Sequence, residues 1–294
     1  MKTFTEPKKL QAWCRRQKLA GRRIALVPTM GYLHEGHLSL IEKAKAKGAD
    51  EIVVSVFVNP VQFCPGEDYE KYPRDEKADL AKCRKAGATA IFFPTPANVY
   101  LDRHSVYVND DDLSKGLFGA RRPGHFRGVC TVVAKLFNLT HPDFAVFGQK
   151  DYQQAQVIKR MVRDLNFDLE IVVAPIVREP SGLARSSRNT YLSPEEKERA
   201  LAISWSLGSL RVGVGSLRVG VGSTSVGVGS AKTLKTLRTL ADVRKSLEKA
   251  GLKVDYVECV DAETLEPRKR IEKGCCVLVA AYDGKTRLID NVLI

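Results

Sequence analysis

Several features that would assign this chain at once to a familiar class are scarce or missing. Its 294 residues contain no apolar run long enough to span a bilayer, and residues 1–7 lack the apolar stretch of a secretory signal. The seven cysteines include no C-x-x-C pair, so the sequence suggests neither a disulfide framework nor a zinc site. We therefore expect a cytoplasmic protein that does not enter a membrane.

Acidic residues are also outnumbered, since 34 aspartates and glutamates stand against 47 lysines and arginines, for a formal net charge of +13. Such an excess suits nucleic acid, but it also suits an enzyme whose substrates are small anions. Aromatic residues make up only 7% of the chain and do not interleave with the densest basic cluster, at residues 232–249. We interpret that cluster mainly as a solvated helix face and expect no nucleic-acid partner.

Apolar strand-like runs alternate with helical patterns from Arg23 to about Val173, and we expect residues 1–175 to form the first domain. The expected strands cover residues 23–27, 51–58, 90–93, 143–147 and 169–174. This alternation is typical of a Rossmann-like parallel sheet with helices on both faces. Right-handed crossovers bring the carboxyl ends of such strands to one edge, where α/β proteins bind their ligands.

Residues 176–294 predict a smaller C-terminal α+β domain. Ser193, Pro194 and Glu196 have the types and spacing of a helix N-cap, a first-turn proline and a capping box. The strand-like runs that follow, typical of an antiparallel sheet, cover residues 254–260, 276–281 and 287–289.

A seven-residue repeat interrupts this second domain. S-L-R-V-G-V-G occupies residues 209–215 and again 216–222, and a degenerate copy follows at 223–229. Its glycines are unsuited to a coiled coil, and three units are too few for a solenoid. We expect a low-complexity surface insertion at about 209–229 whose deletion leaves turnover nearly unchanged; an ordered functional element is the alternative.

The most informative stretch is residues 28–37, P-T-M-G-Y-L-H-E-G-H, where the first strand gives way to the first helix. A helix start offers unpaired N–H groups and about half a positive charge, which together favour anions. His34 and His37 lie three residues apart there, while Gly31 and Gly36 let a ligand approach the backbone closely. We interpret the pair as a phosphate site. A zinc site, which needs a third ligand, and a helix-capping or core role are the alternatives.

Three further stretches follow strands or loops expected at the same edge, at residues 59–63, 147–154 and 185–189. Together with other motifs they resemble the pantothenate synthetase family, the pantoate–β-alanine ligases of the nucleotidyltransferase superfamily. The resemblance covers nearly the whole chain except the repeat. The motifs that carry it, in chain order, are PTMGYLHEGH, FVNPVQF, EDYEKYPR, HFRGV, FGQKDYQQ, SSRN and GKTRLIDN.

This resemblance implies a two-step ligation. ATP and pantoate give pantoyl adenylate and pyrophosphate, and the amine of β-alanine then displaces AMP to give pantothenate. It further implies Mg²⁺ held by the ATP phosphates, without assigned protein ligands, and a homodimer. The alternatives are another small-molecule nucleotidyltransferase, an inactive homologue and, from a different class, a basic RNA-binding protein on a synthetase-like fold.

The resemblance also implies the roles of individual residues. Those for ATP are Met30, Gly31, Tyr32, Leu33, His34, Glu35, Gly36, His37, Gly148, Gln149, Lys150, Asp151, Val177, Arg185, Ser186, Ser187 and Arg188. The catalytic ones are His34, His37, Lys150, Ser186, Ser187 and Arg188, with His37 as proton donor. Gln62 and Gln154 would bind pantoate, and Gln62 would also place β-alanine. The second domain would act as a lid that carries phosphate-binding loop 185–189.

Two positions depart from the family pattern. Ser181 stands where an acidic residue is common, and Arg185 stands where an apolar methionine is common. If the family contact at position 185 uses the backbone, an arginine is tolerated and its charge favours triphosphate. If the arginine side chain has to enter an apolar base pocket, its desolvation costs several kcal/mol.

Overall fold

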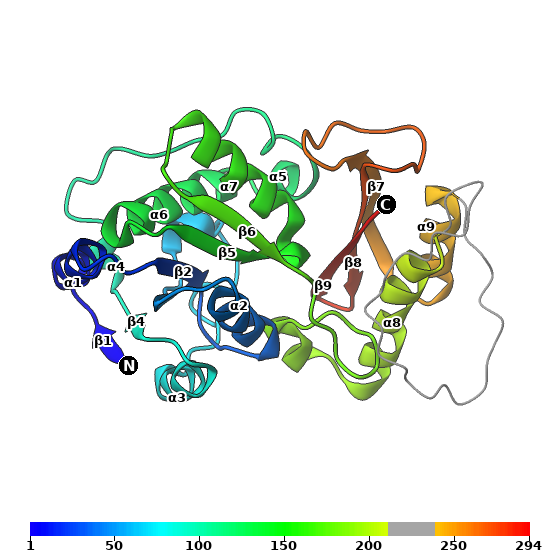
Figure 1. Ribbon diagram of the computed structural model, residues 1–294. Helices are drawn as coiled ribbons and strands as arrows, with labels where there is room; N and C mark the ends of the chain where they lie inside the picture. The colour runs from blue at the N-terminus through cyan, green and yellow to red at the C-terminus, as the bar shows by residue number, and fades with distance from the viewer. Residues whose placement is uncertain (211–238) are drawn as a thin grey trace. The chain divides into compact units, whose positions relative to one another are not determined.

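The computed structural model describes residues 1–210 and 239–294, which form two compact units, Met1–Pro175 and Ile176–Ile294 (Figure 1). From position 211 onward, the repeat predicted at 209–229 lies outside the described residues. Within the described ranges, no helix combines the length and the apolar composition needed to traverse a bilayer.

The first unit is built on a six-stranded sheet in which every pair of neighbouring strands is parallel. Its strands are β1 (Lys2–Phe4), β2 (Ile24–Thr29), β3 (Glu51–Val56), β4 (Ala90–Phe92), β5 (Phe144–Gly148) and β6 (Glu170–Ala174). Their order is β1-β4-β3-β2-β5-β6, so β2 lies between β3 and β5 where the strand order reverses. The Rossmann-like parallel sheet predicted from the sequence is confirmed.

Helices cover both faces of this sheet (Figure 1). They are α1 (Pro7–Leu19), α2 (Glu35–Ala46), α3 (Glu76–Ala86), α4 (Pro96–Val99), α5 (Leu117–Arg121), α6 (His125–Thr140) and α7 (Tyr152–Asp164), with short 3₁₀ turns η1 (Pro60–Gln62) and η2 (Gln149–Asp151). On one face, Ala25 and Val27 of β2 pack in a core with Ile41 of α2. The alternate residues Ile24 and Leu26 are fully buried as well. Burial on both faces explains why the strands read as continuous apolar runs.

Two elements at the N-terminus were not predicted from the sequence. Strand β1 has only three residues and pairs with β4 alone, at the edge of the sheet. Helix α1 is mostly polar and buries only Leu10, Trp13 and Cys14. Neither segment carries enough apolar periodicity to be recognised without its neighbours.

In its described residues, the second unit combines helices α8 and α9 with an antiparallel sheet in the order β7-β8-β9. Its elements are η3 (Ser187–Tyr191), α8 (Pro194–Gly208), α9 (Leu240–Lys249), β7 (Lys253–Asp261), β8 (Cys275–Asp283) and β9 (Thr286–Leu293). Ser193 and Glu196 form the predicted capping box at the start of α8. The last strand runs beyond residue 289, because Leu293 still pairs with Cys276.

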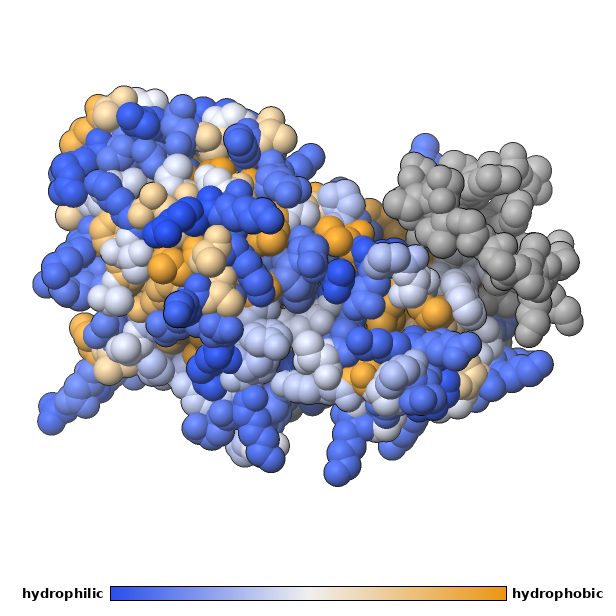
Figure 2. Space-filling model, turned by 90° about the horizontal axis from the view of Figure 1, so that it is seen from below, coloured by the Kyte–Doolittle hydropathy of each residue, from blue (hydrophilic) through white to orange (hydrophobic). Residues whose placement is uncertain are grey.

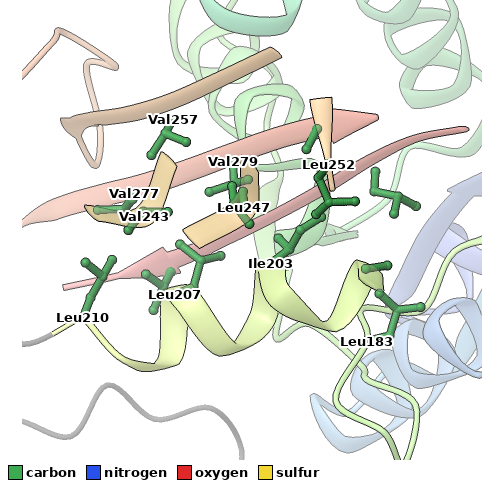
Figure 3. Packing of buried hydrophobic residues seen from close by; sticks show 14 of the residues in the cluster. Leu183, Ile203, Leu207, Leu210, Val243, Leu247, Leu252, Val257, Val277 and Val279 are labelled. Atoms are coloured by element: carbon green, nitrogen blue, oxygen red, sulfur yellow. The ribbon is translucent and has the colours of Figure 1, made fainter. Parts of the chain in front are cut away.

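A separate hydrophobic core holds this unit together (Figure 3). Ile203 and Leu207 of α8 and Leu247 of α9 belong to one cluster with Val277 and Val279 of β8. Elsewhere on the molecule, Figure 2 shows a face on which hydrophilic residues predominate and hydrophobic residues form smaller groups between them.

Candidate active site

The two histidines cap helix α2 reciprocally. His34 is the N-cap in extended conformation, and its Nδ1 accepts a hydrogen bond from the Gly36 N–H at 3.1 Å. His37 Nδ1 accepts from the His34 N–H at 3.2 Å, and the two rings lie 4.1 Å apart between centroids. The capping role that the sequence left as an alternative is therefore real. It does not exclude anion binding, because it uses only the Nδ1 atoms for the cap.

Capping also determines the tautomer of His37, that is, which ring nitrogen carries the proton. Since Nδ1 accepts from a backbone N–H, the proton of the neutral ring resides on Nε2. The pKa of His37 lies well below its ordinary value of 6.5, first because the ring is desolvated and then because His34, Lys150 and Lys82 add positive charge nearby. In the free protein His37 is thus a neutral imidazole with an Nε2–H donor. A bound phosphate would offset the cationic neighbours and raise this pKa.

A buried carboxylate clamps the loop before α2, residues 30–34, which we call the histidine loop. Asp79 of α3 is 1% exposed, and its two oxygens accept from the Tyr32 N–H at 2.8 Å and the Leu33 N–H at 2.7 Å. A Cβ on Gly31, whose φ is +87°, would lie 3.0 Å from the same carboxylate, so glycine is required here. Lys82, one turn further along α3, donates to the Leu33 carbonyl at 2.6 Å. Sequence reasoning missed Asp79; an acidic residue on a buried helix position was the available signal.

The second predicted segment lies beside this loop. Gln62 ends η1, directly after β3, and is 8% exposed. Its Nε2 lies 2.9 Å from the Met30 sulfur, so the loops that follow β2 and β3 meet at this point. Its Oε1 accepts from the Nδ2 of Asn59 at 3.2 Å. One predicted pantoate ligand therefore adjoins the histidine loop.

The backbone of Gln62 is fixed by the start of α6, which carries the HFRGV motif. A Cβ on Gly128 would lie 2.6 Å from the Gln62 nitrogen, so α6 and η1 pack backbone against backbone. His125 Nδ1 donates to the Gln62 carbonyl at 2.8 Å, and Arg122 donates to it at 3.2 Å while pairing with Glu67. Burial and the neighbouring Arg122 lower the pKa of His125 to about 4. The motif thus supports the position of Gln62.

The third predicted segment follows β5 and forms η2 and the first turn of α7. The charge of Lys150 depresses the pKa of His37, which places this lysine near the histidine loop. Gln154 is half-buried on α7, and its side chain makes no hydrogen bond with any residue that the structure describes. Its neighbour Gln153 is buried and donates to two backbone carbonyls of the segment before α5. Of the two glutamines, Gln153 thus uses its amide in hydrogen bonds within the described fold, whereas Gln154 does not.

The remaining predicted residues belong to the second unit, where a short hairpin precedes the predicted phosphate loop. Arg178 and Ala184 form an antiparallel bridge, and the Arg185 N–H donates to the Val177 carbonyl at 2.9 Å. The Arg178 guanidinium makes two bonds, at 2.6 and 3.0 Å, to the buried carboxylate of Asp290. This pair fixes the hairpin to strand β9.

The predicted phosphate loop 185–189 has an internal scaffold of its own. Ser186 is the N-cap of η3, and its hydroxyl accepts from the Arg188 N–H at 3.3 Å. Asn189 is buried and donates to Glu179 at 2.9 Å. Arg185, the departure noted in the sequence, extends its guanidinium to within 3.6 Å of the same Glu179 carboxylate. Its charge is therefore partly matched by a neighbour within this unit.

The first unit alone suffices to define a class of protein. Three predicted segments follow β2, β3 and β5, which are adjacent strands at the point where the sheet order reverses. In α/β sheets this is the place for a ligand, and a helix start flanked by histidines and a lysine is suited to phosphates. The fold and site are those of an α/β enzyme that acts on a nucleotide.

The comparisons identify the family. The family model for pantoate-beta-alanine ligase matches residues 2–293, and the chain belongs to this family. A pantothenate synthetase from Myxococcus xanthus is 51% identical over 295 aligned positions, which span 99% of this chain and 94% of that relative. A pantothenate synthetase from Anaeromyxobacter dehalogenans is 52% identical over 98% of this chain and 96% of its own length.

Solved structures give the same result. The pantothenate synthetase from Thermus thermophilus superposes with a TM-score of 0.83 and 40% identity, covering 99% of this chain and 98% of that one. The pantoate–β-alanine ligase from Francisella tularensis, solved with β,γ ATP and β-alanine, gives a TM-score of 0.77 at 31% identity over 100% and 97% of the two chains. The chain is accordingly an ATP-dependent ligase that joins pantoate to β-alanine through an adenylate.

Proposed function

We propose that this chain forms pantoyl adenylate at the carboxyl edge of the first unit's sheet, using the histidine loop for ATP and the two glutamines for pantoate. The observation that carries the proposal is the contact between Gln62 and Met30, because it puts a buried amide beside a histidine-capped helix start. A carboxylate held at Gln62 and a phosphate held at His37 would then be neighbours.

The chemistry of adenylation requires two anions to approach each other. The pantoate carboxylate attacks the α-phosphorus, and pyrophosphate leaves with the electron pair of the broken P–O bond. The amine of β-alanine then attacks the acyl carbonyl, and AMP leaves. The α2 N-terminus, the Nε2–H of His37 and the charge of Lys150 would stabilise the charge that accumulates on the phosphates. As the phosphate raises its pKa, His37 could also serve as proton donor.

Neutral amides suit the acid. Gln62 and Gln154 can bond to the carboxylate and hydroxyls of pantoate without holding the nucleophile in a strong ion pair. In our proposal Gln62 also places β-alanine. The remaining nucleotide contacts come from the residues that surround these groups in sequence: Met30, Gly31, Tyr32, Leu33, Glu35, Gly36, Gly148, Gln149 and Asp151.

In our proposal the second unit is a lid-like domain that carries a phosphate-binding loop at residues 185–189. Ser186, Ser187 and Arg188 would contact phosphates, and Val177 and Arg185 would contact the rest of the nucleotide. Support comes from the scaffold of this loop, in which Arg178 and Asn189 fix its flanks. Arg185→Met tests the departure from the family pattern. If the arginine side chain contributes, ATP KM rises in the variant; if only the backbone contacts ATP, KM is unchanged.

Mg²⁺ is expected to enter with the phosphates of ATP. Asp79, the buried carboxyl group that clamps the histidine loop, fits poorly as a ligand because both its oxygens accept from backbone N–H groups. When bound, Mg²⁺ would neutralise charge on the leaving pyrophosphate. Titration of ATP-free protein with Mg²⁺ by calorimetry should show no binding stronger than the millimolar range, whereas tight binding to the free protein would overturn this assignment.

Two further properties are proposed from the family resemblance. We expect a homodimer, which sedimentation velocity at micromolar concentration will test against a monomer. We also expect a cytoplasmic location, in keeping with seven free cysteines of which six are buried. Fractionation of the source cells would check it.

Omission of single substrates tests the proposed reaction. With all three substrates, AMP, pyrophosphate and pantothenate should form in equal amounts. Without β-alanine, multiple-turnover AMP release should stop. Replacement of pantoate by another small carboxylic acid should abolish pyrophosphate release, and undiminished release with that acid would contradict the proposal in favour of a different nucleotidyltransferase.

A further inference from the structure

A chain of hydrogen bonds leads away from Gln62, in the proposed pantoate site, to a half-buried tyrosine that is not among the predicted site residues. The Tyr100 hydroxyl, at the end of α4, donates to the Oδ1 of Asn59 at 2.8 Å. Asn59, which is 1% exposed, donates from Nδ2 to Gln62 Oε1 at 3.2 Å. Three residues from two separate segments thus form one relay.

Two backbone groups determine which atoms donate and which accept along this relay, because an N–H can only donate and a carbonyl can only accept. The Val61 N–H, a donor, faces Asn59 Oδ1 at 3.3 Å, and the Gly128 carbonyl, an acceptor, faces Nδ2 at 3.0 Å. The amide of Asn59 can therefore be oriented in only one way. It follows that Tyr100 must donate to Asn59, and that Gln62 must turn its oxygen toward Asn59.

The tyrosine is well suited to remain a donor. Burial raises the pKa of its hydroxyl far above the ordinary value of 10, so it keeps its proton throughout the working pH range. Its ring is held between Phe57 and His104, with centroid distances of 6.5 and 5.0 Å. These contacts do not depend on the hydroxyl, so removing the oxygen alone should leave the packing intact.

We propose that Tyr100 is a positioning residue: its hydrogen bond holds the Asn59 side chain in place, and Asn59, oriented by the backbone, turns the NH₂ group of Gln62, rather than its carbonyl, toward pantoate. The NH₂ group is the end that lies beside Met30. A donor in this place matches an oxygen of the acid, such as its carboxylate, and it disfavours an ammonium group. Gln62 would accordingly contact β-alanine through the carboxylate and leave the amine unbonded for its attack. The inference rests on the proposed assignment of Gln62 to pantoate.

The test is a double-mutant cycle on Tyr100 and Gln62. Tyr100→Phe should raise the pantoate KM about three- to tenfold, the effect of one neutral hydrogen bond, and leave the ATP KM unchanged. In a Gln62→Ala background the same substitution should have no further effect on pantoate KM. Tyr107→Phe is the matched control, because the Tyr107 hydroxyl makes no hydrogen bond within the described part of the chain while its ring packs on Arg127. It should behave like the unmutated protein.

A second variant reverses the polarity. Asn59→Asp can still accept from Tyr100, but it cannot donate to Gln62, so the glutamine amide should rotate and present its oxygen to the substrate. Pantoate KM should then rise by at least about tenfold, because a donor becomes an acceptor facing a carboxylate. The side-chain NH₂ signals of Gln62 in the substrate-free protein, assigned by their loss in Gln62→Ala, should shift in both variants and not in Tyr107→Phe.

The possible outcomes distinguish the role of Tyr100 from the assignment of Gln62 to pantoate, on which it rests. Unchanged pantoate KM in Tyr100→Phe, or an equal increase in the Gln62→Ala background, would overturn the role of Tyr100 while the ligase activity stands. If Gln62→Ala itself left pantoate KM unchanged, the assignment of Gln62 to pantoate would fail, and the proposal would fail with it.

Discussion

His37 combines two tasks that the same ring can perform together. Its Nδ1 caps helix α2, a bond that does not use Nε2–H, and we propose that this second nitrogen donates to a phosphate at the helix start. We expect His37→Ala to lower kcat at least about a hundredfold, since positioned proton transfer and charge stabilisation are commonly worth that much. Steady-state pyrophosphate release will measure it.

The matched control for this substitution is His141→Asn. His141 is exposed and has a left-handed backbone with φ of 43°, which asparagine tolerates. This variant should keep the unmutated kcat. Equal activity of the two variants would show that His37 serves the helix alone.

The protonation of His37 gives a second prediction at this scale. Its pKa in the folded protein lies below 6.5, as does that of buried His125, at about 4. As pH falls below 6.5, the unfolded chain binds protons that the folded chain does not, so both residues make the protein less stable toward acid. NMR titration should find both rings neutral at pH 6.

Binding of ATP should separate the two histidines. A phosphate beside His37 should raise the pKa of His37, while His125, enclosed by Arg122 and the Gln62 carbonyl, should not respond. A His37 signal that titrates near 6.5 without ATP, or an equal shift of both rings, would contradict the assignment.

At the level of single residues, the sequence revealed those that have a motif and missed those that act through it. His34, His37 and Gln62 stand in recognisable runs. Asp79 and Tyr100 hold these runs in place, but their partners Leu33 and Asn59 lie 46 and 41 residues away, and only the folded chain brings them together. Asn59 stands within a recognised run, but its bond to Gln62 was not predicted. The capping bonds of the histidines also depended on a backbone geometry that spacing alone does not give.

Helix α3 is the element on which the histidine loop depends, because its Asp79 satisfies two buried N–H groups of that loop. Asp79→Ala should lower the free energy of unfolding by about 1–3 kcal/mol for each N–H left unpaired. The loop should also relax, and ATP KM should rise about tenfold or more. Chemical denaturation and initial rates provide the two measurements.

The control is Asp75→Ala on the same helix. Asp75 caps α3 by accepting from the Ala78 N–H at 2.9 Å, so its loss should cost about 1 kcal/mol without changing ATP KM. A similar rise in KM in both variants would mean that stability of α3, and not the clamp, controls ATP binding.

The packing of α6 against η1 leads to a prediction about pantoate. Gly128→Ala would place a methyl group 2.6 Å from the Gln62 nitrogen, which only a displacement of η1 can relieve. We expect kcat/KM for pantoate to fall about a hundredfold, because displacements of about 1 Å in a reacting site have effects of that size. Gly116→Ala, at a position with nothing within 4 Å of the added carbon, should be nearly neutral. Comparable losses in the two variants would contradict the packing argument.

At the level of elements, the pattern of apolar residues predicted the strands and helices that burial stabilises. Strands β2, β3 and β5 were expected because both their faces are buried, and α8 was expected from its capping box. The short edge strand β1 and the polar helix α1 escaped prediction because tertiary contacts, and not local pattern, stabilise them.

For the whole molecule, the excess of positive charge agrees with two anionic substrates, ATP and pantoate, and with the carboxylate of zwitterionic β-alanine. The two units have separate cores, and the predicted catalytic residues are divided between them. We expect the first half-reaction, which forms pantoyl adenylate from ATP and pantoate, to proceed without β-alanine.

The most direct test of this account is the exchange of labelled pyrophosphate into ATP. Exchange should require pantoate, proceed in the absence of β-alanine and fall at least about a hundredfold in His37→Ala. Exchange that needs β-alanine, or that continues undiminished without pantoate, would contradict formation of pantoyl adenylate at the histidine loop.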